Sequence, residues 1–380
     1  MNRQQIALLF LITLIPFTIF SVGRPDFVGG DSYYFLNHVC GEGEMGEGDL
    51  IRTIFGWVPC NFVLIKILLF FMCLSCVFAI ALTGNLLYDQ KGWMAGLFIF
   101  LAPVFFSEFT KFENDQFAYP LIFLSIYFYY KGFFRNRFIN RLTAIVLLVF
   151  AAQIWGGAVL FFPAFAFGSI LFILSTIPLL AVYWQKLLFT ALPRFPSFDL
   201  FGNVWENSLV VGIAYLFLLP LGYWGATKKI LPQLVFFTAL MLLNSKFIFL
   251  LMPFLALGFV GYFNKLDYSK YGKTFKQVFL WMPFFLAISW GLVSLTQPPQ
   301  PYHWQAIEFA LQESGKPGIT NDWGLGYWVL FKGGNTQQFG SPKDFNLSHD
   351  IFITQRNLDS NTCTFLKSFN EVNVYQCHAR

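Results

Sequence analysis

The sequence predicts an α-helical polytopic membrane protein with a small extramembrane α/β domain at its C-terminal end. Hydrophobic residues make up 56% of the 380 positions, and charged residues make up only 12%. The apolar residues are gathered in long blocks, such as 61–83, in which Lys66 is the only charged residue. Such a block is typical of a helix that crosses the hydrocarbon core of a bilayer. We therefore expect lipid to surround most of the chain.

About eleven transmembrane helices are expected. The first apolar run, 6–22, is either a signal peptide or a crossing, and we favour a crossing because no clear small-residue cleavage site follows it. Several later runs are short for a hydrocarbon core of about 30 Å, so their helices must extend into flanking residues. The later runs are 61–83, 93–107, 117–130, 142–155, 158–174, 177–192, 208–226, 230–243, 247–263 and 278–295.

The charged residues indicate the orientation of these crossings. A cytoplasmic N-terminus places the clusters of Lys and Arg in inner loops, as the positive-inside rule requires. The acidic residues, except Asp89 and Asp267, then lie outside, in loops 24–60, 108–116 and 193–207 and in the tail. The net charge of only +5, sorted in this way, argues against a nucleic-acid partner. The inner cations are Lys91, Lys131, Arg135, Arg137, Arg141, Lys228, Lys229, Lys265, Lys270, Lys273 and Lys276.

The composition changes near residue 297. We expect residues 1–296 to form the transmembrane domain and residues 297–380 a small extracytoplasmic α/β domain. Three prolines at positions 298, 299 and 301 should break any helix there. In the tail, the pattern predicts a helix over 304–311 and strands over 327–331, 350–354 and 372–376. In a prokaryote this multi-pass protein would lie in the plasma membrane, with its C-terminal domain outside.

Four of the six cysteines fall on the expected outer side. Cys40 with Cys60, and Cys363 with Cys377, are either two disulfides in an oxidising compartment or free thiols. The other two, Cys73 and Cys76, lie within a crossing, where we expect helix packing and not a redox motif.

Several acidic residues stand at the outer ends of crossings, where water and lipid headgroups reach. These are Asp31, the pair Glu113 and Asp115, and Glu206. Carboxylates from separate loops would supply hard oxygen ligands for Mg²⁺ or Mn²⁺, or each acid is simply solvated. Lys246 follows at another outer end, where its cation either faces a phosphate or reaches lipid headgroups.

The tail contains a Gly-rich aromatic motif, DWGLGYW, at 322–328. We expect a turn that carries Asp322, Trp323 and Tyr327. Exposed aromatic faces beside an acid would suit the binding of a sugar or a peptide acceptor. The alternative is a packed turn with buried tryptophan.

Taken in order, these motifs resemble the integral-membrane GT-C glycosyltransferases. The likeness is strongest to the catalytic subunit of oligosaccharyltransferase and its single-chain archaeal and bacterial relatives. It spans nearly the whole chain and rests on several motifs that all fall on the outer side. The motifs are DSYY (31–34), FENDQF (112–117), QIWGGAVLF (153–161), NVWE (203–206), SKF (245–247) and DWGLGYW (322–328).

This resemblance implies a bound divalent metal and a polyprenyl-linked sugar donor. It assigns Asp31, Glu113, Asp115 and Glu206 to the metal, with Asp31 and Glu206 also catalytic, and it places Lys246 at the donor phosphate. It further implies transfer from dolichyl or another polyprenyl phosphate or pyrophosphate to an acceptor, with inversion at the anomeric carbon. The acceptor is expected to be a protein or a glycan.

The tail departs from the family at its acceptor motif. The family has Trp-Trp-Asp-Tyr-Gly, whereas this chain has Asp-Trp-Gly-Leu-Gly at 322–326. Transfer of single sugars to a lipid or glycan therefore remains an alternative to transfer onto protein. A lipid or ion transporter and a noncatalytic assembly subunit are alternatives from other functional classes.

Overall fold

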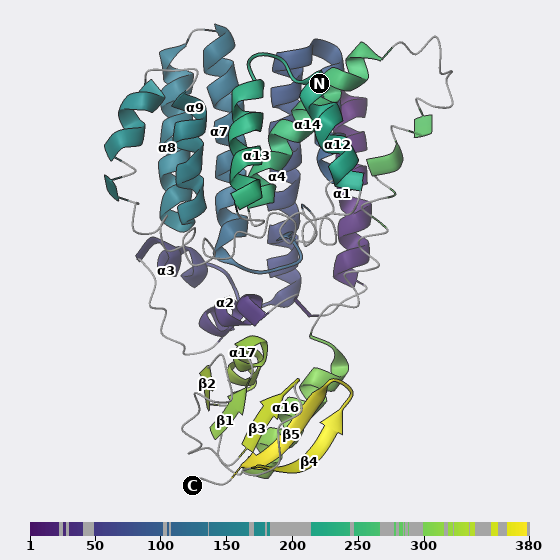
Figure 1. The fold of residues 1–380 in the computed structure, drawn as a ribbon, viewed down its shortest axis with the longest axis vertical. Coiled ribbons are helices and arrows are strands. Elements are labelled where there is room, and N and C mark those ends of the chain that lie inside the picture. Colours follow the sequence, from purple (N-terminus) through teal and green to yellow (C-terminus); the bar gives the residue numbers. More distant parts are fainter. Residues whose placement is uncertain are drawn as a thin grey trace. The chain divides into compact units, whose positions relative to one another are not determined.

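A computed structural model gives the fold, and it divides the chain into two compact units (Figure 1). The helical unit comprises Met1–Gly23, Ile67–Phe109 and Asn114–Leu292. The second unit, here called the α/β unit, comprises Arg24–Lys66, Thr110–Glu113 and Val293–Arg380. Residues 24–66 and 110–113, which the sequence assigned to the transmembrane domain, thus group with the tail.

The structure describes only part of the chain. Its described residues are 1–22, 26–27, 30–40, 49–101, 105, 108–135, 137–166, 171–178, 181–182, 214–243, 247–266, 277–278, 281–283, 285, 288, 299–314, 318–321, 323–333, 335–338, 351–355 and 363–377. Most of the expected crossings at 177–192 and 278–295 lie outside these ranges.

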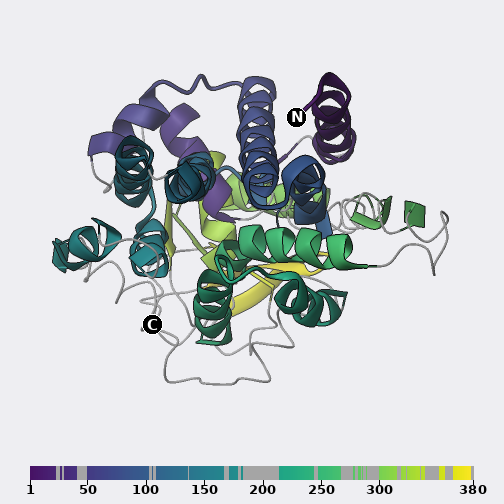
Figure 2. The same ribbon diagram turned by 90° about the horizontal axis from the view of Figure 1, so that it is seen from above.

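The helical unit is built from long apolar helices. In the view from above (Figure 2), α1 and α4 are foreshortened, whereas α14 runs across the view. Helices α7 and α8 pack on each other, and α12 and α13 pack on α14. The main helices are α1 (Arg3–Val22), α4 (Phe62–Tyr88), α7 (Asn114–Arg135), α8 (Phe138–Ile154), α9 (Phe161–Ala166), α12 (Ala214–Gly225), α13 (Leu231–Leu243) and α14 (Ile248–Lys265).

One helical stretch among the described residues, Phe62–Phe98, is long and apolar enough to cross a membrane. Its first part, α4, has 27 residues, about 40 Å of helix, against a hydrocarbon core of about 30 Å. Shorter apolar helices include Arg3–Ile19, Phe138–Ile154, Gly156–Ala166, Leu231–Leu242 and Phe249–Lys265.

The expected third crossing, 93–107, is not one continuous helix in its described part. The chain turns after α4 at Asp89, whose φ is 55°. It continues as η1 (Asp89–Met94), α5 (Ala95–Phe98) and η2 (Ile99–Leu101). The turn is tight because Gly84 and Gly92 bring their backbones together, and a Cβ on either would overlap the other. Further along, Gly96 lies against Val77 and Ala81, so the chain folds back on α4.

Aromatic rings fill much of the interior of the helical unit. The sequence contains 51 Phe residues. The Tyr119 ring stacks on Phe249 with a centroid distance of 3.9 Å, and Tyr129 stacks on Phe165 at 4.1 Å. Offset-stacked and edge-to-face rings add packing energy beyond their buried area. This packing joins α7 to α9 and α14.

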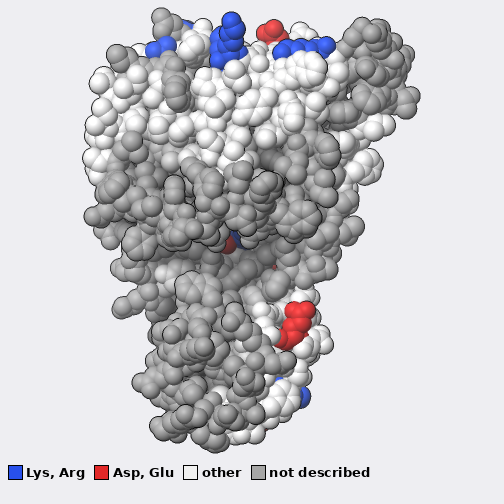
Figure 3. Space-filling view, in the orientation of Figure 1, with Lys and Arg blue, Asp and Glu red and all other residues white. Residues whose placement is uncertain are grey.

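Of the cations that the sequence assigned to inner loops, those in the described part of the chain gather at one end of the helical unit. They lie at the end of α7, the start of α8, the α12–α13 turn and the end of α14. Figure 3 shows Lys and Arg concentrated at this end, with one acidic group among them. Asp115 lies at the opposite end of α7 from Lys131 and Arg135. The described charges of this unit are therefore sorted along the helix axes.

Helices α12 and α14 approach each other through glycines. A Cβ on Gly225 would overlap the backbone oxygen of Gly258, and a Cβ on Gly258 would overlap the backbone oxygen of Gly222. Small residues at such contacts allow helix backbones to meet closely, which is a common way to pack helices in membranes. The four glycines at this contact are Gly222, Gly225, Gly258 and Gly261.

The α/β unit contains four helices and a five-stranded sheet among its described residues. The sheet has the order β2-β1-β3-β5-β4. Strand β1 pairs in parallel with β2 and β3, and β5 pairs antiparallel with β3 and β4. The elements are α2 (Gly30–Cys40), α3 (Asp49–Gly56), α16 (Pro301–Ser314), β1 (Gly318–Asn321), α17 (Trp323–Phe331), β2 (Asn335–Gln338), β3 (Ile351–Thr354), β4 (Cys363–Phe369) and β5 (Val372–Cys377).

Two expectations for the tail are wrong in part. The stretch 327–331 is not a strand but the end of α17, a helix that packs on α2 and on β1 and β2. Pro301 does not break the following helix but begins it, since the first helical position needs no N–H donor. Strands at β3 and β5 and the helix α16 lie where the sequence predicted them.

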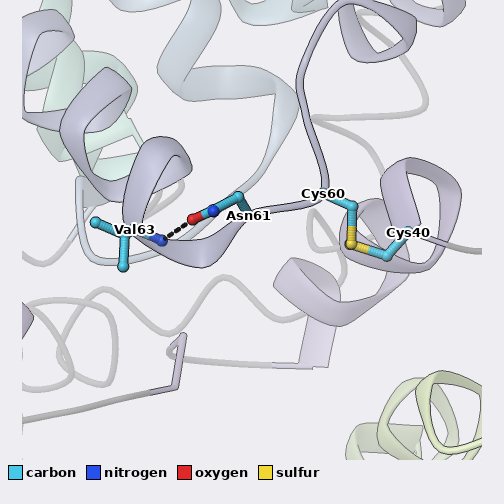
Figure 4. The surroundings of a disulfide bond; sticks show 4 residues. All are labelled: Cys40, Cys60, Asn61 and Val63. Atoms are coloured by element: carbon cyan, nitrogen blue, oxygen red, sulfur yellow. Dashed lines mark hydrogen bonds between the residues drawn. A yellow bond between two sulfur atoms is a disulfide. The ribbon is translucent and has the colours of Figure 1, made fainter.

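A disulfide joins Cys40 to Cys60, linking the end of α2 to the start of α4 (Figure 4). Its Cα atoms are 4.9 Å apart and its sequence separation is 20 residues, a loop whose closure is worth about 3 kcal/mol. The next residue, Asn61, caps α4, since its Oδ1 accepts a hydrogen bond from the Val63 N–H at 3.0 Å. In the sheet, Cys363 is disulfide-bonded and faces Cys377 in the β4–β5 register.

The glycine contact gives a direct test of the α12–α14 packing. We expect Gly258→Ala to lower the free energy of unfolding by about 1–3 kcal/mol, because the new Cβ must displace the α12 backbone. Thermal unfolding in detergent measures this change. The control is Gly56→Ala, where no atom lies within 4 Å of the added Cβ. Equal melting temperatures for the two variants would contradict the close packing.

Candidate functional site

The predicted site residues differ in how much of them the structure describes. Asp31 lies in the first turn of α2, where the backbone is described. Glu113 and Asp115 are described and partly buried. Glu206, Lys246 and Asp322 lie outside the described residues, so their predicted roles stay predictions. Trp323 begins α17, and Tyr327 lies within that helix.

A hydrogen bond joins the first two acidic segments within the α/β unit. The N–H of Phe112 donates to the Oγ of Ser32 at 3.1 Å, and this contact is buried. Ser32 follows Asp31, and Phe112 precedes Glu113. The backbones that carry the two carboxylates are therefore neighbours, although 80 residues separate the two partners of the bond. Asp115 is two residues beyond Glu113, at most about 7 Å away along the chain.

Tyr33 fixes α2 on the tail. Its ring is fully buried. It makes edge-to-face contacts with Trp304 of α16 at 5.3 Å and with Phe331 of α17 at 5.1 Å. Trp328, also from α17, lies 6.4 Å away. Burial of one large aromatic side chain among three others supplies a strong hydrophobic anchor, and this anchor lies two residues from Asp31.

Trp304 makes a second link between the first outer segment and the tail. Its Nε1–H donates to the Oδ2 of Asp26 at 3.1 Å. A hydrogen bond to a charged acceptor is stronger than one between neutral groups. Asp26 therefore holds the chain just before α2 against α16. This carboxylate therefore has a structural role.

Partly exposed aromatic side chains lie along α2 and α17. The Tyr34 ring lies 5.1 Å from Tyr327 and 4.7 Å from the ring of His38. Trp328, in contrast, is 3% exposed. Of the two alternatives for this motif, the buried tryptophan is found at Trp328, because α17 packs on α2. The expected turn is wrong, since 323–331 is helical. Tyr327 remains on the partly exposed side, beside Tyr34.

The helical unit holds the start of α7 through polar contacts. The side-chain amide of Asn114 donates to the carbonyl oxygen of Ile154 at 3.2 Å. The hydroxyl of Tyr119, one turn later, donates to the Oδ2 of Asp115 at 3.4 Å. An acidic residue in the first turn is also stabilised by the helix dipole. These contacts fix the Asp115 carboxylate at the N-terminal end of α7.

The QIWGG segment contributes Trp155, which packs against Tyr119. The Trp155 ring lies 5.6 Å from that of Tyr119, which in turn stacks on Phe249. Gly157 leaves room for the indole, since a Cβ there would overlap the Trp155 ring. The Asp115 carboxylate thus contacts Tyr119, whose ring packs in an aromatic cluster with Trp155 and Phe249.

Sequence reasoning missed several residues that organise the site. Ser32 and Tyr33 lie within the DSYY motif, but their partners cannot be identified from local sequence. Among the described residues, no group of three or more His, Cys, Asp or Glu side chains is placed to hold a metal ion. The fold brings segments 31–34 and 110–113 together, through the hydrogen bond between Phe112 and Ser32.

The fold resembles that of an archaeal oligosaccharyltransferase. No family model matches the chain, and no curated protein matches its sequence. The oligosaccharyltransferase of Archaeoglobus fulgidus, in complex with Zn and sulfate, aligns with a TM-score of 0.59 at 10% identity. The alignment covers 92% of this chain and 67% of that protein.

A second structure of the same enzyme, tethered to an acceptor peptide containing the NVT sequon, aligns with a TM-score of 0.58 at 9% identity. It covers 92% of this chain and 65% of the enzyme, so this chain spans about two thirds of the enzyme's length. At such identity the comparison shows the fold alone. The zinc and the acceptor peptide are properties of the archaeal enzyme.

The Ser32–Phe112 bond can be tested by mutation. We expect Ser32→Ala to lower the free energy of unfolding by about 1 kcal/mol, because the bond that links the two acidic segments loses its acceptor. The control is Ser125→Ala, since Ser125 is equally buried but donates only to Ile122 in its own helix. Denaturant unfolding in detergent compares the two. An equal or larger effect of Ser125→Ala would contradict the assigned importance of the bond.

Proposed function

We propose that this chain is a GT-C-type membrane glycosyltransferase. It transfers a sugar or glycan from a polyprenyl phosphate or pyrophosphate to a protein or glycan acceptor on the extracytoplasmic face. The observation that carries the proposal is the Ser32–Phe112 hydrogen bond, which joins the DSYY and FENDQF segments on an oligosaccharyltransferase-like fold. The order of these motifs along the sequence supports the same function.

The acidic residues form a suitable ligand set for a divalent cation. Asp31 and Glu113 would hold Mg²⁺ or Mn²⁺, together with Asp115 and Glu206. Carboxylate oxygens are the ligands that these cations prefer. The adjacency of the backbones at 31–32 and 112–113 supports the fit. When bound, the cation would neutralise negative charge on the departing lipid phosphate.

The remaining assignments describe what the chain's own residues do. In this proposal the acceptor attacks the anomeric carbon of the donor sugar, and the bond from that carbon to the lipid phosphate oxygen breaks. Asp31 accepts the proton that the acceptor loses. Lys246 lies at the departing phosphate, where Lys offers charge without the bidentate fork of Arg. Glu206 completes the site from its outer loop.

The acceptor would bind along the face formed by α2 and α17. Tyr34 and Tyr327 are support for this assignment, because their partly exposed rings lie 5.1 Å apart. Trp323 begins α17, and with Asp322, which precedes it in the sequence, it belongs to the segment that resembles the family's acceptor motif. Since the chain lacks the Trp-Trp-Asp order, single-sugar transfer to a lipid or glycan is the second candidate activity.

Asp31→Asn tests the catalytic assignment. We expect transfer of labelled sugar in membranes to fall at least 100-fold, because general-base catalysis alone contributes about 10²–10⁴-fold. The control is Asp89→Asn, which makes the same change of charge directly after the C-terminal end of α4. Asn adopts a positive φ such as the 55° found there more readily than most residues do.

Transfer by the Asp31→Asn variant at the wild-type rate would contradict the assignment of Asp31 as the catalytic base. If wild-type membranes show no transfer to any acceptor but the purified chain moves lipid or ions into liposomes, the protein is a transporter and not a glycosyltransferase. A chain that shows neither activity, yet is needed by a partner glycosyltransferase, would be an assembly subunit.

A further inference from the structure

Side chains from three elements meet at the cation-rich end of the helical unit. The hydroxyl of Tyr130, near the end of α7, donates to the carbonyl oxygen of Lys229 at 3.4 Å. The Nζ of Lys229 lies 3.6 Å from the centroid of the Phe134 ring. Arg141 of α8 packs its side chain on Gly132 of α7. The end of α7, the start of α8 and the α12–α13 turn therefore form one surface.

The charge of this surface is strongly positive. Arg135, Arg137, Lys228 and Lys229 are exposed, and we call these four residues the basic rim. None of them forms a salt bridge with any residue that the structure describes. Figure 3 shows one acidic group at this end. Among the described residues, the acid at the turn after α4 is Asp89. The rim therefore attracts anions, and a phosphate group would complement it.

Apolar side chains flank the basic rim. Phe138 is 61% exposed and Ile139 62% exposed, directly after Arg137. Phe133 and Phe134 are also exposed, directly before Arg135. A water-soluble anion would gain little from these groups. An amphiphile with an anionic headgroup and acyl chains would satisfy both the cations and the apolar side chains.

We infer that the basic rim binds the headgroup of an anionic phospholipid of the cytoplasmic leaflet. Its phosphate contacts Arg135 and Arg137 on one side and Lys228 and Lys229 on the other. Its acyl chains lie along Phe138 and Ile139. This site lies at the opposite end of α7 from Asp115 and does not depend on the proposed transferase activity.

Native mass spectrometry of the full-length chain in detergent tests this inference. The probes are phosphatidylglycerol and phosphatidylcholine with identical acyl chains. We expect retention of phosphatidylglycerol in preference to phosphatidylcholine. The Lys228→Gln, Lys229→Gln double variant should weaken the phosphatidylglycerol affinity by about 25-fold, since each cation near an anionic lipid surface is worth about fivefold.

Matched variants separate this site from general electrostatics. Lys332→Gln with Lys367→Gln removes the same charge from the α/β unit and should leave phosphatidylglycerol binding unchanged. Phe138→Ser with Ile139→Ser keeps every cation, alters only exposed side chains, and should also weaken binding. This variant tests the inference independently if the double-Gln variant does not fold.

Three results would overturn the inference. The first is equal retention of the two lipids by the wild type. The second is unchanged phosphatidylglycerol affinity in folded variants of the rim or of its apolar flank. The third is complete displacement of the lipid by an equal concentration of inorganic phosphate or of an acidic peptide, which would identify a site for a soluble anion and not for a lipid.

Discussion

The burial of Tyr33 among Trp304, Trp328 and Phe331 is the contact on which the candidate site depends. It anchors α2 to the tail, and the neighbouring Ser32 can then accept its hydrogen bond from Phe112. Without this anchor, the first turn of α2, which carries Asp31, would lose its aromatic packing on α16 and α17. Ordering such a segment costs conformational entropy, which the aromatic burial and the Cys40–Cys60 disulfide offset.

The helical unit is stabilised by different contacts. Few polar groups are buried among its described residues, and ring stacking and glycine contacts hold these helices together. Charged groups lie at helix ends. In α7, for example, Asp115 lies in the first turn and Arg135 in the last. One end is equipped for the proposed carboxylate chemistry. The other carries the basic rim, whose chemistry suits anionic lipid headgroups.

The sequence predicted the features that depend on local pattern. Apolar blocks predicted the helices, and alternation predicted β3 and β5. The prediction of a strand at 327–331 is wrong because a short apolar run fits a buried strand and a buried helix equally well. The Ser32–Phe112 bond spans 80 residues and leaves no local signal. At 10% identity, the comparison with the archaeal oligosaccharyltransferase shows a likeness of fold alone.

Binding of Mn²⁺ to the purified chain tests the central claim, that Asp31 and Glu113 share one cation. Calorimetric titration would compare the wild type with Asp31→Asn, Glu113→Gln and the double variant. A shared site predicts that each single change weakens binding and that the double change adds little, because both groups serve the same ion. Additive losses, or wild-type affinity in either single variant, would contradict the shared site.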